Sequence, residues 1–508
     1  MSFRSASRRL VAISAAAASL MVTPASAANA QSMRNATIGE KLRSGIAEIF
    51  ATGAAPGMSV VVVMDTAVVY LDGFGDADVA ARRRVTPETV FYIASSTKSF
   101  TALATALLDH EGIVSLDAPL SRYLPSARLH QPLSADSVTM RELLTHTHGI
   151  DNDGPVVFRT AFSGEHDHEM LERLIADHPE DERGGAFHYG NIGYNVASLA
   201  LDRVTGKSWK DVVAERVLEP LGMSSTTGYV SRVSDVLLAQ PYVPGDTGSE
   251  PIPYIKTDGN MHAAGGLVST AADMARWLEV NINDGVLDGR RVFPEDVMRE
   301  AHRMQVPHGD SLGSWPRHGY ALGWQVGTYG GDTLLHHFGG FPGFDAHVSF
   351  MPGRRIGVAV LVNGGMGGSL MNQVAQYVYD VAAGGVDADS AAAERSAELS
   401  DLIARVRDQI ANNRAERRAR PQELPHPLSA YAGTYESPTF GRMVWTVESG
   451  RLVARIGALS SVAEAYRAAD NILRVELIPA SGNSVRFAFE GDTAARLVWQ
   501  DVTFERLR

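Results

Sequence analysis

The feature that most constrains the fold is the separation along the chain of two groups of strand-like segments. Residues 58–64 form a near-continuous apolar run, and similar runs return at 334–338, 346–351 and 357–362. Short apolar runs bounded by turn residues are typical of buried strands. The intervening residues 117–330 are richer in helices and loops. This arrangement predicts an α/β (α+β) fold, in which an antiparallel sheet is flanked by helices and carries a helical subdomain.

The chain is long enough for a second domain, and its last part changes character. A length of 508 residues exceeds what one hydrophobic core usually holds, so we assign a first domain to residues 33–383. Residues 384–428 form a linker, with a charged helix over 396–418 followed by a proline-rich stretch. Short alternating strands fill 429–508 and predict a small all-β barrel or sandwich. Because the linker is rich in proline, we expect a stable fragment ending near residue 420.

The N-terminus has the parts of a secretory signal peptide. Three arginines within the first nine residues form a basic start, residues 10–22 are apolar and rich in alanine, and Ala25-Ser26-Ala27 offers small residues for cleavage. The apolar stretch is shorter than the roughly 20 residues that span a bilayer, so we expect no stable membrane span. Residues 1–27 are therefore predicted to be a signal peptide, and the protein is expected to be secreted or, in a bacterium, periplasmic.

Composition and missing motifs exclude several classes of protein. The formal net charge is −12, so the chain lacks the basic character that nucleic-acid binding requires. The absence of cysteine excludes disulfides and a thiol nucleophile. Gly206-Lys207-Ser208 lacks the leading glycine of a phosphate-binding loop, since Leu201 stands in its place. We expect no cofactor.

Two histidine-rich segments leave a metal site as a minor alternative. Residues 165–169 read Glu-His-Asp-His-Glu, and His146-Thr147-His148 is followed by Asp151 and Asp153. Without a further, separated ligand such clusters are more often solvated loops than metal centres. We therefore expect no metal.

The first candidate for chemistry is Ser95-Ser96-Thr97-Lys98, at the start of a long apolar helix expected over residues 96–110. Side chains three residues apart share a helix face, so Ser95 and Lys98 can touch. A lysine desolvated in an apolar pocket can stay neutral and accept the proton of a serine hydroxyl. A helix N-terminus also offers N–H groups to a developing oxyanion. Chance matches to so short a motif are common, and its position gives it weight.

Two further motifs follow in the chain. In Tyr189-Gly190-Asn191 the phenol can take part in proton transfer and the amide can hold a substrate carbonyl, although a turn with Gly-Asn is the simpler interpretation. In His337-Phe338-Gly339-Gly340 an apolar strand precedes the histidine, and the glycines allow a ligand close to the strand edge. Neither motif is specific in isolation.

The three motifs in this order resemble the class C β-lactamase, D-aminopeptidase and bacterial esterase branch of the serine penicillin-recognising superfamily. The resemblance covers roughly residues 35–383 and includes flanking segments such as Leu143-Leu144-Thr145-His146-Thr147 and Tyr320-Ala321-Leu322-Gly323-Trp324. The last 80 residues resemble the lipocalin-like domain appended to some of these hydrolases.

The resemblance implies a role for each candidate residue. Ser95 is the acylating nucleophile, Lys98 and Tyr189 share the proton transfers, and Asn191 binds the substrate amide. His337 holds the position of a lysine in many relatives, and Gly339 and Gly340 line the substrate site, with the N–H of Gly340 and that of Ser95 forming the oxyanion hole. This chain departs from the family pattern at His148, where relatives usually carry serine, and at His337.

These observations predict an exported serine hydrolase that works through an acyl-enzyme on Ser95. Its substrate, a small molecule or a peptide, contains an ester, lactam or D-amino-acid-type amide. The alternative is a catalytically idle binding or scaffold protein on the same fold. The sequence leaves the substrate and the oligomeric state open.

The histidine at position 337 further predicts a preference for uncharged substrates. Near neutral pH a histidine of ordinary pKa, about 6.5, is mostly uncharged and cannot anchor a carboxylate as lysine does. Arg354 and Arg355 are candidates to compensate. Lowering the pH toward 6 is expected to improve the KM for carboxylate-bearing substrates.

Overall fold

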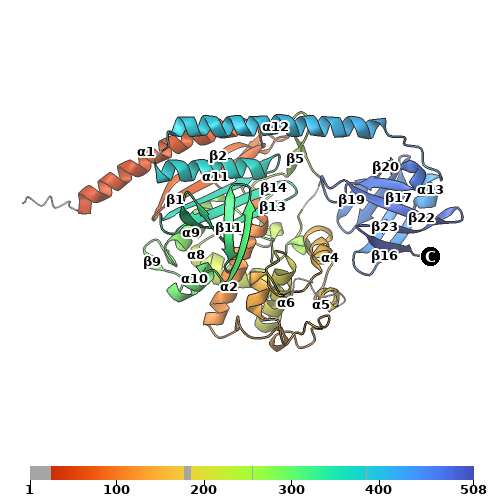
Figure 1. The fold of residues 1–508 in the computed structure, drawn as a ribbon, viewed down its shortest axis with the longest axis horizontal. Coiled ribbons are helices and arrows are strands. Elements are labelled where there is room, and N and C mark those ends of the chain that lie inside the picture. Colours follow the sequence, from red (N-terminus) through yellow and green to blue (C-terminus); the bar gives the residue numbers. More distant parts are fainter. Residues whose placement is uncertain (1–23, 177–184, 254–255, 385) are drawn as a thin grey trace, which may run out of the picture.

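The structure is a computed structural model that describes residues 24–176, 185–253, 256–384 and 386–508. Of the predicted signal peptide, residues 1–27, the first 23 lie outside the described residues, and the last four belong to α1. Two units make up the described chain, a large one built around a sheet and a small β domain at the C-terminal end, with helix α12 extending along both (Figure 1). The mixed α and β fold expected from the sequence is confirmed.

The sheet of the large unit has nine antiparallel strands in the order β10-β11-β12-β13-β14-β15-β1-β2-β3. The strands are β10 Val306–Leu312, β11 Trp315–Tyr320, β12 Gln325–Tyr329, β13 Asp332–Phe341, β14 Phe344–Met351, β15 Ile356–Val362, β1 Gly57–Met64, β2 Ala67–Asp78 and β3 Arg83–Arg84. Strand β1 is buried along its whole length between β15 and β2. Val60 and Val62 join one hydrophobic core and Val61 and Val63 the other. Burial on both faces therefore explains the unbroken apolar run in the sequence.

Helices cover both faces of this sheet (Figure 1). One face carries α1 Pro24–Phe50, α11 Gly367–Ala383 and α12 Ala388–Ala419, and the other carries α2 Thr97–His110, α9 Ala271–Ile282 and α10 Glu295–His302. The helical subdomain comprises α3 Met140–Thr145, α4 Asp153–Val157, η3 Phe158–Ser163, α5 His168–Ala176, α6 Ile192–Thr205, α7 Trp209–Val213, η4 Ala214–Leu218 and α8 Glu219–Leu221. Short pairs of strands join the loops: β4 Phe91–Tyr92 with β7 Val268–Ser269, β5 Tyr242–Pro244 with β6 Ser249–Pro251, and β8 Val286–Leu287 with β9 Arg290–Arg291.

The sequence analysis missed three strands of the main sheet. The sequence indicated mainly helices and loops for residues 117–330, yet β10, β11 and β12 lie within them and form one side of the sheet. Strand β10 is at the edge and is largely exposed, with the sequence Val-Pro-His-Gly-Asp-Ser-Leu. An exposed edge strand has no buried face, so its sequence carries no alternation of apolar and polar residues.

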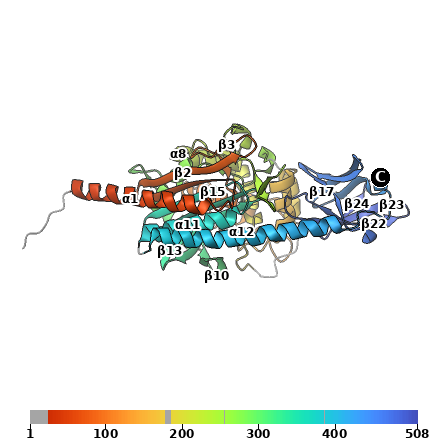
Figure 2. The ribbon, with the colours of Figure 1, turned by 90° about the horizontal axis from the view of Figure 1, so that it is seen from above.

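The predicted linker is mostly one long helix. Helix α12 has 32 residues, and its first half packs against α1 and α11, burying Ala392, Leu399 and Ile403 (Figures 1 and 2). Its last turns reach the β domain, where Arg417 Nη2 lies 2.7 Å from Glu464 Oε1. A helix anchored at both ends restricts the movement of the two units more than a proline-rich coil would.

The β domain is a nearly closed, nine-stranded antiparallel sheet, which confirms the predicted all-β barrel. Its strands, in spatial order, are β19 Leu459–Val462, β18 Arg451–Ile456, β17 Gly441–Glu448, β16 Gly433–Ser437, β24 Val502–Arg506, β23 Thr493–Trp499, β22 Asn483–Glu490, β21 Ile472–Val475 and β20 Glu464–Arg467, preceded by α13 Leu428–Tyr431. Aromatic side chains dominate its core, among them Trp445, Phe487 and Trp499.

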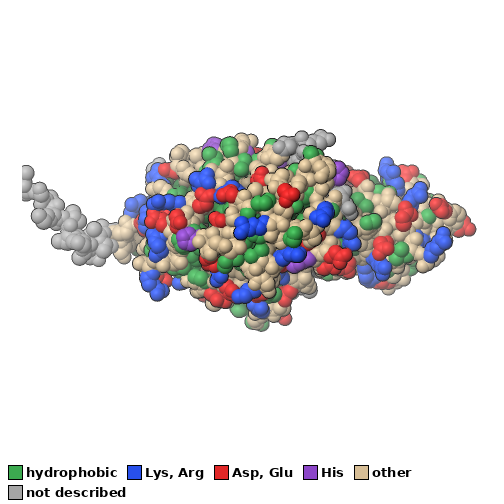
Figure 3. Space-filling view, turned by 90° about the horizontal axis from the view of Figure 1, so that it is seen from below, with side chains coloured by type: hydrophobic (Ala, Val, Ile, Leu, Met, Phe, Trp, Pro, Cys, Tyr) green, Lys and Arg blue, Asp and Glu red, His purple; other side chains and the backbone are tan. Residues whose placement is uncertain are grey.

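The surface seen from below carries acidic and basic side chains interspersed with one another (Figure 3). On this face the acidic side chains therefore lie in small groups among basic ones. Among the described residues, none of the helices combines the length and the apolar character needed to cross a membrane.

Candidate active site

Ser95 lies where the chain leaves β4 and enters α2, in the short helical turn η1 Ala94–Ser96. Every residue from 89 to 108 is buried except Ser95, which is partly exposed. Ala94 adopts a φ of 43°, a left-handed conformation that is unfavourable for a residue with a side chain and is found most often at functional sites. Ser96 Oγ donates to the carbonyl of His337 at 2.9 Å and so ties this turn to β13. The predicted nucleophile is therefore the accessible point of a buried segment.

Lys98, one turn after Ser95 and the second residue of α2, is fully buried, and its amine contacts three oxygens. Nζ lies 2.7 Å from Asn191 Oδ1, 2.8 Å from the carbonyl of Ala264 and 3.2 Å from Ser95 Oγ. Burial lowers the pKa of Lys98 to about 7, and the Asp153 carboxylate opposes part of that fall. A neutral amine has two hydrogens for the two carbonyl oxygens and one lone pair for the Ser95 hydroxyl.

Tyr189 and Asn191 come from the loop that leads into α6. Desolvation raises the pKa of Tyr189 to about 12, while its hydrogen bond to Ser95 lowers it. Because 38% of the Tyr189 surface is exposed, solvent limits the rise in its pKa. The phenol nevertheless stays protonated near neutral pH. The Lys98 amine lies 5.0 Å from the centre of the Tyr189 ring. The structure thus brings Ser95, Lys98, Tyr189 and Asn191 together, as the motif spacing predicted.

Asp153 holds the start of α6 in place. Its Oδ1 accepts from the backbone N–H of Asn191 at 2.5 Å and from that of Ile192 at 2.8 Å. These N–H groups have no acceptor within the helix, so the carboxylate accepts their hydrogen bonds. Its negative charge also interacts favourably with the positive end of the helix dipole. The sequence analysis considered Asp153 only as a metal ligand, because a cap supplied from 38 residues away leaves no local signal.

His337 faces the site from β13 and is 2% exposed. Its Nε2 lies 3.2 Å from the Tyr320 hydroxyl and its Nδ1 3.1 Å from the carbonyl of Phe338. Burial holds the pKa of His337 well below its usual 6.5, and the Lys98 amine lowers it further. Its burial therefore argues against a protonated His337 at pH 6, and against the improvement in KM for carboxylate-bearing substrates that the sequence led us to expect there.

The two arginines considered as replacement cations have other partners. Arg354 Nε lies 2.7 Å from Asp332 Oδ2, and Arg355 Nε lies 2.7 Å from Asp65 Oδ1. Both follow β14 at the turn into β15, beside the beginning of β13, whereas the glycines of the site are near the end of β13. They do not compensate for a neutral His337.

The two glycines of the His337 motif differ in their surroundings. A Cβ on Gly339 would lie 2.0 Å from the carbonyl of Ile93, so close packing of β13 against the Ser95 turn requires glycine there. At Gly340 the nearest atom to such a Cβ is Asp345 Oδ1 at 3.7 Å, and the residue is exposed. Gly339 therefore serves the packing of the site, and Gly340 is open to a substrate.

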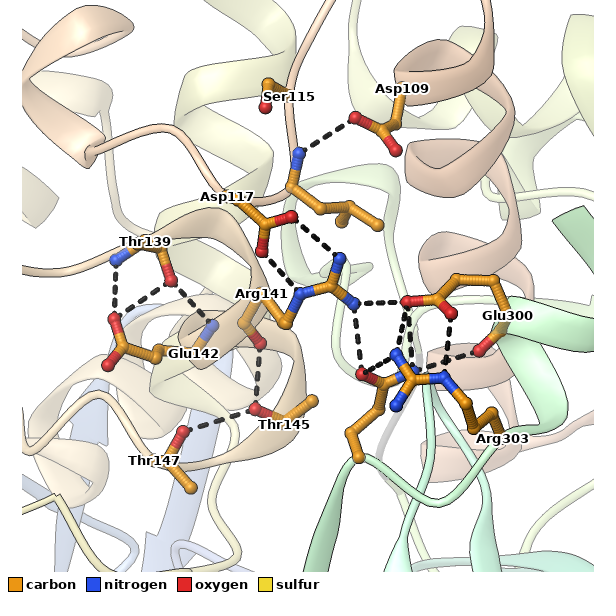
Figure 4. Close-up of polar contacts among 12 residues, drawn as sticks. Asp109, Ser115, Asp117, Thr139, Arg141, Glu142, Thr145, Thr147, Glu300 and Arg303 are labelled. Atoms are coloured by element: carbon orange, nitrogen blue, oxygen red, sulfur yellow. Dashed lines mark hydrogen bonds and ion pairs between the residues drawn. The ribbon is translucent and has the colours of Figure 1, made fainter.

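The histidines of the Thr145-His146-Thr147-His148 segment are part of the packing. Helix α3 is fixed by Arg141, whose guanidinium bonds to Asp117 and Glu300 (Figure 4). The helix ends at Thr145, and the next residue, His146, has a left-handed φ of 61°. The buried His146 ring lies 4.7 Å from those of Tyr189 and Tyr320. It packs against the ring of Tyr189, a role the sequence analysis did not assign.

His148 and the 165–169 segment do not form a metal site within the described residues, where no group of three or more suitable side chains gathers. His148 Nδ1 accepts from the N–H of Ile150 at 3.0 Å. His168 Nε2 lies 3.1 Å from Asp202 Oδ2. Residues 165–169 are mostly exposed, as expected for a solvated loop, whereas His146 and His148 are buried in the packing around the site.

Behind the site, the fully buried His336 provides a test of the electrostatics. Neither of its ring nitrogens has a hydrogen-bond partner, its ring stacks on Phe338 at 4.4 Å, and burial holds its pKa well below 6.5. The unfolded chain binds a proton at this residue below about pH 6.5 and the folded chain does not, so stability is lost as the pH falls through that value.

We therefore expect His336→Leu to flatten the pH dependence of unfolding. Between pH 7.5 and 5.5 the variant should lose about 1.4 kcal/mol less unfolding free energy than the wild type. Urea unfolding at the two pH values measures this difference, with the exposed His318→Leu as control. Equal losses in His336→Leu and wild type would contradict the burial argument.

Comparison with known proteins agrees with this geometry. A family profile described as Beta-lactamase matches residues 42–383. Protein flp of Staphylococcus aureus (strain MW2) is 25% identical over 326 residues, which are 61% of this chain and 60% of the relative. Unguisins hydrolase ungD' of Aspergillus campestris is 27% identical over 432 residues, which are 78% of this chain and 76% of the relative. The chain thus spans about 60% of the length of the Staphylococcus relatives it matches.

Solved structures share the fold. The octameric penicillin-binding protein homologue from Pyrococcus abyssi superposes with a TM-score of 0.53 at 23% identity, covering 92% of this chain and 99% of the other. The D-amino acid amidase from Ochrobactrum anthropi SV3, complexed with L-phenylalanine amide, gives a TM-score of 0.55 at 21% identity, covering 68% and 98%. At these identities the likeness is one of fold.

Proposed function

Because the chain belongs to the Beta-lactamase family, we propose that it is a serine hydrolase that forms an acyl-enzyme on Ser95 and cleaves an ester, a lactam or a D-amino-acid-type amide. The observation that carries the proposal is the environment of the Lys98 amine. Two carbonyl oxygens at 2.7 and 2.8 Å accept its hydrogens, which leaves the lone pair for the hydroxyl 3.2 Å away. A neutral amine in this position is a base for the serine.

Acylation follows from these positions. Ser95 Oγ attacks the substrate carbonyl carbon while its proton passes to Lys98 Nζ. The negative charge that develops on the carbonyl oxygen is stabilised by the N–H groups of Ser95 and Gly340. Collapse of the tetrahedral intermediate breaks the bond to the leaving group, which takes a proton from the Tyr189 hydroxyl, and the Lys98 ammonium returns a proton to Tyr189. Attack of water on the ester releases the acid and restores Ser95.

The high pKa of Tyr189 and the low pKa of Lys98 support different roles for the two residues. With values of about 12 and about 7, the phenol is a proton donor and the amine is the base at neutral pH. The sequence left these roles shared. Asn191, whose Oδ1 is occupied by Lys98, keeps its amide N–H groups for the substrate carbonyl.

The environment of His337 supports a preference for uncharged substrates. A neutral, buried His337 offers no fixed charge to a carboxylate, and its neighbour Lys98 disfavours a proton there. A relative named as a hydrolase of unguisins and a structure named as a D-amino acid amidase agree with ester or amide hydrolysis as the reaction class.

Covalent labelling tests the proposal. The intact mass of the wild-type protein should increase by one adduct after incubation with a fluorophosphonate, and Ser95→Ala should show no increase while keeping the wild-type circular dichroism spectrum. A wild type that is not labelled and turns over neither p-nitrophenyl butyrate nor D-amino-acid amides would favour the alternative of an idle binding protein.

A further inference from the structure

A side chain of the hydrolase unit lies inside the core of the C-terminal β domain. Phe158 begins η3 and is 2% exposed. Its ring centre lies 5.2 Å from that of Phe440 and 5.1 Å from that of Trp499, both edge to face, and it belongs to the same buried cluster as the barrel residues. The core of the β domain is therefore completed by a residue from a distant part of the sequence.

The residues that follow Phe158 bond to the backbone of the β domain. Arg159 Nε donates to the carbonyl of Thr439 at 2.8 Å, and the arginine is 7% exposed. A Cβ on Gly441 would lie 2.9 Å from the Arg159 guanidinium, so the glycine makes room for it. The N–H of Ala458 donates to the carbonyl of Ser163 at 3.4 Å. Helix η3 is thus held by contacts along its length.

The same segment leads directly to the active site. Helix α4, which precedes η3 without a break, begins with Asp153. Asp153 Oδ1 accepts from the N–H groups of Asn191 and Ile192, and Asn191 Oδ1 lies 2.7 Å from the Lys98 amine. A continuous series of contacts therefore connects the barrel core with the proposed base.

A second contact joins η3 to the other wall of the site. The ring of Phe162 stacks on that of Phe341 at 5.0 Å, and Phe341 directly follows Gly340 in β13. Lys256 Nζ donates to the carbonyl of Ala161 at 2.8 Å and lies 3.7 Å from the centre of the Phe341 ring. Helix η3 thus connects the β domain with both sides of the site, the side of Asp153 and the side of Gly340.

Local structure alone does not fix this segment. Helices α4 and η3 have five and six residues, and isolated helices shorter than about 12 residues are marginal in water. Their position depends on packing. The aromatic partners of Phe158 are in the β domain, and Arg159 bonds both to that domain, at the carbonyl of Thr439, and to the carbonyl of Glu165 in the hydrolase unit.

We propose that the C-terminal β domain is a positioning element of the active site, and that Phe158 and Arg159 are the residues through which it acts. By holding η3, the domain fixes Asp153, and Asp153 fixes Asn191 and the Lys98 amine. The proposal rests on the proposed acylation of Ser95. The sequence led us to expect a stable fragment ending near residue 420. The proposal instead predicts that such a fragment has an impaired active site, because removal of the β domain exposes Phe158 and frees η3.

A matched pair of variants tests this proposal in the full-length protein. Phe158→Ala and Phe487→Ala each remove a phenyl ring from the same core, but the ring contacts of Phe487 are with Tyr431, Tyr435 and Trp445 of the β domain itself. Fluorophosphonate labelling rates are measured against pH, at a temperature where circular dichroism shows both variants folded.

Phe158→Ala is expected to lower the labelling rate by roughly tenfold to a hundredfold, the range that a displacement of about 1 Å produces. Water that reaches Lys98 should also move the acidic limb of the pH profile upward by about half a unit or more. Phe487→Ala should keep the wild-type rate and profile. If Phe158→Ala does not fold, Arg159→Met, which leaves the barrel core intact, should show the same two changes, and Arg159→Lys should recover part of the rate.

The proposal is overturned if the wild type is labelled and Phe158→Ala has the same labelling rate and pH profile as Phe487→Ala. Where Phe158→Ala does not fold, Arg159→Met takes its place in this comparison. Loss of labelling in the wild type itself would instead contradict the acyl-enzyme function.

Discussion

Replacing Lys98 with methionine is expected to lower the rate of acylation by on the order of a thousandfold, because the Ser95 hydroxyl then has no base. Methionine fills nearly the same volume in the buried pocket, so the fold should be kept. Tyr189→Phe should also lose much of the rate. The double variant should be little worse than Lys98→Met, because the two residues serve one proton path.

The pH profile distinguishes the base from the donor. With a Lys98 pKa of about 7, the amine is neutral above that value, so the labelling rate of the wild type should fall as the pH drops below about 7. Tyr189→Phe should retain this acidic limb and Lys98→Met should lose it. An acidic limb that survives in Lys98→Met, or additive losses in the double variant, would show that another group accepts the serine proton.

His337→Lys is expected to raise kcat/KM for carboxylate-bearing substrates by roughly tenfold to a hundredfold, as expected for a charge-assisted hydrogen bond. The wild-type histidine is neutral because it is buried beside Lys98, so acid does not supply this charge. Two esters of similar size, mono-p-nitrophenyl succinate and p-nitrophenyl butyrate, measure the effect as a ratio. His337→Gln, which carries no charge, is the control.

The same ratio in the wild type should be unchanged between pH 7.5 and pH 6. The added cation at position 337 should in turn lower the pKa of Lys98 and extend the active range to lower pH. A wild type that prefers the succinate ester at pH 7.5 would show that a group other than His337 binds the carboxylate.

The features of this protein that the sequence alone determined are those with a local cause. The apolar run of β1 follows from burial on both faces, and the Ser95–Lys98 spacing places the two side chains on one helix face. The order of the three motifs indicated the family that the comparison confirmed. The edge strand β10 was missed because an exposed strand leaves no periodic pattern.

The tertiary structure alone decided the protonation states and the support of the site. The proposed role of Lys98 as a base depends on the carbonyls of Asn191 and Ala264, 93 and 166 residues away, which accept the hydrogens of its buried amine. His337 is neutral because its surroundings exclude water, and Phe158 belongs to the barrel because two distant segments pack together. Desolvation and long-range packing are properties of the assembled chain, and no local pattern of residues encodes them.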